Sequence, residues 1–250
     1  MAGTDVNGLP AVGVRPVLAA AARTYRRRSG VIVGAALVVF GISAVADVLT
    51  DFLADEVSDN PGLLAFLLMV TGMAVFGTEF FAGLTDRIAG QEERGHPRQR
   101  LGHILRTLPY GRLIAADLLL VLGTAVLSIA LFVPGLIFFT FYSLVGPALV
   151  MEDRMVISAF RRSRQLVRGH FWLVLLLVTL PILFEENVVH GFVAIFEGLG
   201  PLTVFVVNVL AGAAVGSVVA VIEVTLAHRL AIRKPASDHA AVEPTHAAPG

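Results

Sequence analysis

The chain has 250 residues, of which 56% are hydrophobic and 15% are charged, and its mean hydropathy is +0.80. Soluble domains carry about 25% charged residues, so this composition argues against a soluble globular domain, a disordered chain and a nucleic-acid-binding protein. The formal net charge is zero, and the absence of cysteine from this chain excludes disulfides, thiol nucleophiles and Cys-ligated metal sites within it.

Apolar stretches long enough to cross a bilayer follow one another along the chain. A spanning helix needs about 20 mostly apolar residues, because only a helix or a closed barrel satisfies its own backbone hydrogen bonds in hydrocarbon. The apolar run 113–151 is nearly twice that length, and Pro134 and Gly135 near its middle predict a tight hairpin between two helices. The fifth stretch is short and contains Pro181, so we expect it to continue past Glu185 into the outer interface. Six spans are predicted, at approximately 31–50, 62–84, 113–133, 136–151, 171–189 and 201–227.

Basic residues are confined to a few segments of the chain. All 19 Lys and Arg residues fall in 1–30, 85–112, 151–170 and 229–234. Cytoplasmic loops retain Lys and Arg, and six spans place all four segments on one side of the membrane. We therefore expect a multi-pass plasma-membrane protein with both termini in the cytoplasm.

The first apolar stretch allows a second interpretation. Arg26 to Arg28, the apolar run from Val31 and the small residues 44–46 before Asp47 resemble a signal peptide with a cleavage site. Cleavage would leave five spans and an external N-terminus. A polar leader of about thirty residues is long for that role, and six spans explain the charge pattern, so we expect the first helix to be retained.

A basic amphipathic helix is expected before spans one, three and five. Such helices suit the membrane surface, with the apolar face sunk and Arg side chains reaching the lipid headgroups. The arginines expected to face headgroups are Arg26, Arg27, Arg106, Arg154, Arg161, Arg164 and Arg168. Each of these helices precedes an out-and-back pair of spans. The predicted fold is therefore all-α, a six-helix transmembrane bundle with interfacial helices and a suggestion of three repeats, although positive-inside loops contain Arg in any case.

These segments define the expected domain organisation. Residues 1–30 form a cytoplasmic N-terminal segment with a basic amphipathic helix, residues 31–230 form the membrane domain, and residues 231–250 form a cytoplasmic tail. The tail is rich in Ala and Pro and is expected to be disordered.

The region 133–172 carries a pattern that goes beyond hydropathy. It reads Val133-Pro134-Gly135, then Gly146-Pro147 with Glu152 at the helix exit, then Ala159-Phe160-Arg161-Arg162-Ser163, then Leu166, Gly169 and Trp172. This order resembles the glycerophosphoryl diester phosphodiesterase membrane domain family. The resemblance implies the six-span layout with basic helices over residues 15–230, and it implies architecture rather than activity, because nothing here supplies the soluble phosphodiesterase domain to which that membrane domain is sometimes fused. The short fifth span, interrupted by Glu185 and Glu186, departs from the family pattern.

Of the acidic residues within the predicted spans, three lie about one turn from a cytoplasmic end: Glu79, Asp117 and Glu223. Ionisable groups inside a membrane are costly, so each needs a partner or a role. One interpretation is an acidic cluster that faces a cytoplasmic cavity and binds a cation or carries protons. The other, which we favour from the sequence, is that each acid pairs with a nearby arginine or reaches interfacial water, since groups near helix ends do so at little cost.

Motifs of the common enzyme classes are absent, among them G-x-x-x-x-G-K-[ST], G-x-G-x-x-G, G-x-S-x-G and H-E-x-x-H. Glu185, Glu186 and His190 lack metal-ligand spacing and are interpreted as solvated charges on the outer side. No catalytic residue, metal or cofactor is assigned, and topology accounts for the Arg clusters without nucleic acid.

Three functions follow in order of preference from the sequence. The first is a non-enzymatic membrane module that engages lipids, including anionic headgroups, or an unidentified partner protein through its basic helices. The second is a small-solute or ion transporter or channel that uses the acidic cluster. The third is a lipid-processing enzyme.

Overall fold

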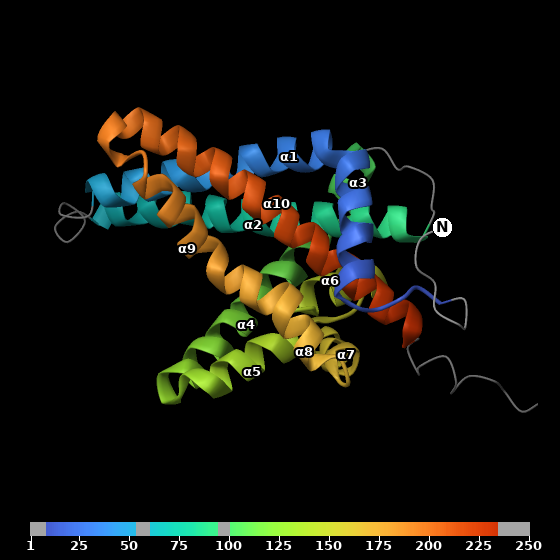
Figure 1. The fold of residues 1–250 in the computed structure, drawn as a ribbon. Coiled ribbons are helices and arrows are strands. Elements are labelled where there is room, and N and C mark those ends of the chain that lie inside the picture. The colour runs from blue at the N-terminus through green and yellow to red at the C-terminus, as the bar shows by residue number, and fades with distance from the viewer. Residues whose placement is uncertain (1–8, 54–60, 95–100, 235–250) are drawn as a thin grey trace, which may run out of the picture.

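The computed structural model describes residues 9–53, 61–94 and 101–234, and every regular element in these residues is a helix (Figure 1). The all-α class is therefore confirmed. The elements are α1 (Val14–Leu53), α2 (Pro61–Arg94), α3 (Leu101–Thr107), α4 (Tyr110–Ala130), α5 (Phe132–Tyr142), α6 (Val145–Glu152), α7 (Val156–Val167), α8 (Phe171–Val174), the π-helical turn η2 (Leu175–Thr179), α9 (Leu180–Ala194), the 3-10 turn η3 (Glu197–Leu199) and α10 (Pro201–Arg233).

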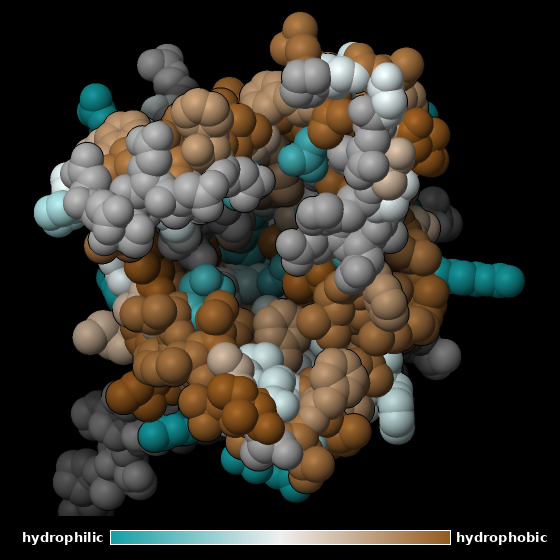
Figure 2. Space-filling model, turned by 90° about the vertical axis from the view of Figure 1, so that its left-hand side faces the viewer, coloured by the Kyte–Doolittle hydropathy of each residue, from teal (hydrophilic) through white to brown (hydrophobic). Residues whose placement is uncertain are grey.

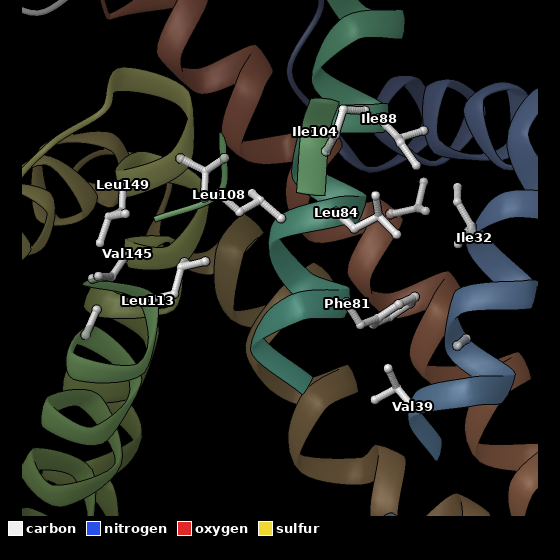
Figure 3. Close-up of a cluster of buried hydrophobic side chains, with 14 of the residues drawn as sticks. Ile32, Val39, Phe81, Leu84, Ile88, Ile104, Leu108, Leu113, Val145 and Leu149 are labelled. Carbon is white, nitrogen blue, oxygen red and sulfur yellow. The ribbon is translucent and has the colours of Figure 1, made fainter. Parts of the chain in front are cut away.

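The three longest helices, α1, α2 and α10, pack side by side along the length of the molecule (Figure 1). Apolar residues at helical spacing explain the contact. Ile32 and Val39 of α1 lie two turns apart on one face. They meet Phe81 and Leu84 of α2, and the cluster extends through α3 and α4 to Val145 of α6 (Figure 3). This core joins the long helices to the shorter ones.

A second apolar cluster packs α7 and α8 against the C-terminal turns of α10. It brings Leu166 of α7 and Val174 of α8 against Leu226 and Leu230 of α10, and all four side chains are fully buried. Burying an aliphatic side chain contributes about 1.5–3 kcal/mol. The C-terminal turns of α10 are thereby fixed against α7.

Several helices are long and apolar enough to cross a membrane. Among the described residues there are four, Val14–Thr50, Tyr110–Ile129, Phe132–Glu152 and Leu202–Arg233. The helices Val156–Val167 and Phe171–Glu185, bent by 105° at their junction, make a fifth if they count as one span. These helices support a multi-pass membrane protein, whereas the count of six spans and the three repeats stay predictions.

The outward-facing side chains of the candidate spans fit a lipid environment. Val38 of α1 and Leu118 and Ile129 of α4 are more than half exposed, a pattern that would be costly in water over such a large area. Figure 2 views the end of the molecule at which α9 meets α10. Hydrophobic residues surround a hollow on this face, and hydrophilic atoms are visible inside it.

The hairpin between α4 and α5 lies earlier than predicted. The chain turns at Leu131, which is extended, so Pro134 and Gly135 lie in the first turns of α5 and do not form the turn. Proline fits there because the first N–H groups of a helix need no intrahelical acceptor. Gly135 has a different role: a Cβ at this position would lie 1.9 Å from the Ser128 Oγ of α4. It permits the two helices to approach closely.

The predicted fifth span contains a π-helical turn. Pro181 lacks the N–H that would bond to Leu177, and the hydrogen-bond ladder widens at Leu175–Thr179 just before it. The helix then continues past Glu185 to Ala194 as expected.

The basic helices that precede the spans take two forms. α3 and α7 are separate helices, and α3 ends before Pro109. The corresponding residues before the first span belong to α1 without a break, although Figure 1 shows this N-terminal part turned away from the rest of the helix. Residues 1–8 of the N-terminal segment and residues 235–250 of the predicted disordered tail lie outside the described residues.

Candidate functional site

A cavity of about 370 Å³ lies within the helix bundle and is lined by three carboxyl side chains. They come from different helices: Asp86 from α2, Asp117 from α4 and Glu223 from α10. The rest of the wall is mainly apolar and includes Leu120 and Phe139. The site therefore combines a hydrophobic enclosure with converging negative charge.

Small residues explain why the helices leave this space unfilled. Ala82 and Gly83 of α2, Ala116 of α4, Gly146 of α6 and Ala220 of α10 all line the cavity. With no side chain beyond a methyl group, they let the helices approach without occupying the volume between them. The helix backbones can thus lie close together while the cavity between them stays unfilled.

Asp117 is placed in the cavity by the period of α4. Leu113, Ala116 and Leu120 line the same cavity, and residues three or four positions apart share one helix face. Among the described residues, no hydrogen bond or ion pair joins the Asp117 carboxylate to a neighbour. Its carboxyl group is open to a ligand in the cavity.

Asp86 forms a buried pair with His228. Its Oδ1 lies 3.3 Å from His228 Nε2, and the two side chains are only 4% and 3% exposed. The other ring nitrogen, Nδ1, is buried and has no hydrogen-bond partner in the described part of the chain, which favours placing the ring proton on Nε2, facing the carboxylate. Gly90 makes room for the ring, because a Cβ there would lie 2.5 Å from it. The pair links the cavity wall to the C-terminal turns of α10.

The structure brings together two of the three acids named from the sequence. Asp117 and Glu223 line one cavity, whereas the side chain of Glu79 lies outside the described residues. Asp86, two turns along α2 from Glu79, takes the third place. The role of the cluster remains a prediction.

Hydropathy does not identify Asp86 and His228 as site residues. Both lie within two residues of the predicted cytoplasmic span ends, at 84 and 227, and so fall within the predicted loops. An ionisable residue directly beyond an apolar run, with small residues one turn before it, is the signal that was available.

The exposed arginines lie on the helices that precede or begin the candidate spans. Six of the seven expected to face headgroups are exposed to solvent: Arg26, Arg27, Arg106, Arg161, Arg164 and Arg168. Arg154 differs, since its Nε pairs with the Glu152 carboxylate. Glu152 also accepts a bond from the buried Arg162 Nε at 2.8 Å, so the two guanidinium groups share one carboxylate.

Lys234 holds the end of α7. Its ammonium donates hydrogen bonds to the carbonyl oxygens of Gln165, Leu166 and Arg168, the acceptors that a helix C-terminus leaves without partners. Burial, with Arg162 and Arg168 nearby, lowers the pKa of Lys234. Burial and the charges of Lys234 and Arg233 likewise lower the pKa of His170. His170 therefore adds no positive charge here at neutral pH.

The described residues contain no group of three or more His, Asp or Glu side chains close enough to hold a metal ion. The side chains of Glu186 and His190, considered for the outer side, lie outside the described residues, and Glu185 is partly buried on α9.

No protein-family model, no curated protein and no solved structure matches this chain.

Proposed function

We propose that this multi-pass membrane protein binds a small organic cation in the cavity lined by Asp86, Asp117 and Glu223, as the binding step of transport. The convergence of three carboxyl groups from three helices on one cavity carries this proposal. Negative charge within a membrane bundle is costly unless it is compensated, and a cationic ligand provides compensation beside Asp117, to whose carboxylate no described residue bonds.

The chemistry of the wall favours an organic cation over an inorganic one. An ammonium group donates hydrogen bonds to carboxylates, while its alkyl substituents contact the apolar wall formed by side chains such as Leu120 and Phe139. Small-molecule sites typically combine a largely apolar cavity with a few placed polar groups. The spacing of the acids fits this description better than direct metal coordination.

Neutralising the cavity acids is expected to abolish cation binding. With butylammonium as a probe, Asp117→Asn and Glu223→Gln should each weaken binding about tenfold or more, the size of one lost charge-assisted hydrogen bond. Binding of a second probe, tetraethylammonium, which has no N–H to donate, should weaken through the lost charge attraction alone. Isothermal titration calorimetry on the purified full chain measures the affinity, and uptake into proteoliposomes tests transport.

Asp47→Asn provides the matched control, because Asp47 is exposed near the C-terminal end of α1 and does not line the cavity. This variant should bind both probes as the unmodified chain does. Equal affinity of all variants, or a failure of the unmodified chain to bind either probe, would overturn the proposal. Binding without uptake would limit the role to that of a receptor or sensor.

A second candidate function is a membrane module that engages lipids or a partner protein through its basic helices. The six exposed arginines favour it. This role requires the arginines to lie in the cytoplasm, with the chain in the plasma membrane.

Cysteine labelling tests that orientation directly, since the chain contains no cysteine. In intact cells, a membrane-impermeant maleimide should label Gly198→Cys, on the exposed turn before α10, and leave His103→Cys, exposed on α3, unlabelled. Permeabilised cells should show labelling of both, which controls for access. External labelling of His103→Cys would reverse the topology.

A further inference from the structure

We propose that the outer face of α7 is a binding surface for anionic lipid headgroups. This inference deepens the second candidate function by naming the lipid bilayer as the partner, and it is independent of cation binding in the cavity. It follows from the orientation of α7, the residues on its outer face and the way the helix is held.

The direction of α7 suits a helix that lies along the membrane surface. It meets the following helix, Phe171–Glu185, at an angle of 105°. If that helix crosses the bilayer, α7 lies nearly parallel to the plane of the membrane. Amphipathic helices in this orientation place basic side chains among headgroups and apolar side chains at the acyl boundary.

Three arginines lie in line along the outer face of α7, the last of them, Arg168, being the residue that caps its C-terminus. Arg161, Arg164 and Arg168 are spaced by three and four residues, so they share one face, and Ile157 precedes them by one turn on the same line. All four side chains are exposed, and among the described residues none of the three guanidinium groups forms an ion pair. Nearby acids are already engaged: Glu152 pairs with Arg154 and Arg162, and Asp153 pairs with Arg112 at 3.0 Å.

Exposed apolar residues lie four positions before and four positions after these arginines in the sequence. Ile157 and Trp172 are 72% and 77% exposed. Tryptophan is enriched at the level of lipid headgroups, where its ring is partly solvated, and Arg matches phosphate through paired N–H donors. Basic residues flanked by exposed apolar side chains complement an anionic bilayer surface in charge and in polarity.

The opposite face of α7 is fixed, so the basic face is presented rigidly. Leu166 and Val167 are fully buried. Ser163 Oγ donates a hydrogen bond of 2.9 Å to the carbonyl oxygen of Phe141, and Lys234 caps the last carbonyls of the helix. Binding at this surface therefore costs little additional ordering.

Trp172, the single tryptophan of the chain, reports on the lipids beside α7. The full chain is reconstituted in nanodiscs of fixed phosphatidylglycerol and phosphatidylcholine content, with bromine on the acyl chains of one lipid or, at equal mole fraction, of the other. Because bromine quenches at short range, the comparison measures which lipid is enriched. Brominated phosphatidylglycerol should quench about twofold more strongly, as expected for attraction of anionic lipid by several basic residues.

The triple variant R161Q/R164Q/R168Q should make the two brominated lipids quench equally. The variant R161K/R164K/R168K keeps the charge and should keep the preference, and circular dichroism reports the helix content of both. If the glutamine variant fails to fold, a salt titration of the unmodified chain replaces it, since screening should remove the preference. Equal quenching in the unmodified chain, or a preference that survives both the glutamine substitutions and salt, would overturn the proposal.

Discussion

Asp86→Ala is expected to lower the free energy of unfolding by about 3 kcal/mol, because it leaves the buried His228 ring without its hydrogen-bond partner. Removing one member of a buried polar pair costs more than the pair contributes, since the remaining group still has to be desolvated. Unfolding in mixed detergent micelles, followed by loss of helix, measures the change.

Asp117→Ala is the matched control for this prediction. Asp117 lines the same cavity, but it is only partly buried and no described residue bonds to its carboxylate, so the substitution should cost less than about 1 kcal/mol. The double variant Asp86→Ala/His228→Ala should cost less than the sum of its single substitutions, because the second removes the group that the first leaves unsatisfied. Equal costs at Asp86 and Asp117, or strict additivity, would contradict the pairing.

Gly90 offers an independent probe of the same pair. An alanine Cβ would lie 2.5 Å from the His228 ring, so Gly90→Ala displaces the ring and weakens its contact with Asp86. The expected effect is a loss of stability smaller than that of Asp86→Ala, because the ring can shift while the carboxylate remains.

The sequence predicts the helices of this fold better than it predicts the contacts between them. Long apolar runs and the positions of Pro and Gly are local properties, and they suffice for the all-α class and for the end of α3 before Pro109. The contact between Asp86 and His228 joins residues 142 positions apart. It depends on how α2 and α10 pack, which hydropathy does not encode.

The candidate site contains residues that the sequence identifies and one that it does not. Asp117 and Glu223 are identifiable because each interrupts an apolar run. Asp86 is not, because it lies beyond the predicted end of the second span at residue 84 and so within the predicted loop. The predicted position of the hairpin differs from the observed one because proline and glycine occur in turns, in first helical turns and at close helix contacts. For Gly135, only the packing against Ser128 distinguishes these uses.

Gly135→Ala is expected to destabilise the fold by about 2 kcal/mol, through overpacking between α4 and α5. The new Cβ would lie 1.9 Å from Ser128 Oγ and 3.1 Å from Ser128 Cα. The hydroxyl can rotate away, but the backbone of α4 can yield only by moving the helix. Unfolding in mixed micelles, as for Asp86, measures the loss.

Gly34→Ala makes the same chemical change in an open position. Gly34 lies within α1, and no atom lies within 4 Å of the position its Cβ would take, so alanine should stabilise the helix by up to about 1 kcal/mol through its higher helix propensity. Opposite signs at the two glycines are therefore expected. A gain at Gly135 equal to that at Gly34 would show that α4 and α5 do not approach closely.

The same contact bears on the cavity, because α4 carries Asp117 and α5 carries Phe139 on its wall. Separating the two helices moves the carboxylate away from the apolar surface that would hold the alkyl part of a cation. Adding Ser128→Ala to Gly135→Ala removes the 1.9 Å contact with Oγ but leaves the contacts of 3.0 and 3.1 Å with the Cβ and Cα atoms of residue 128, so it should recover stability only in part. The portion not recovered measures the overpacking from these two remaining contacts, and cation affinity should fall in proportion to it.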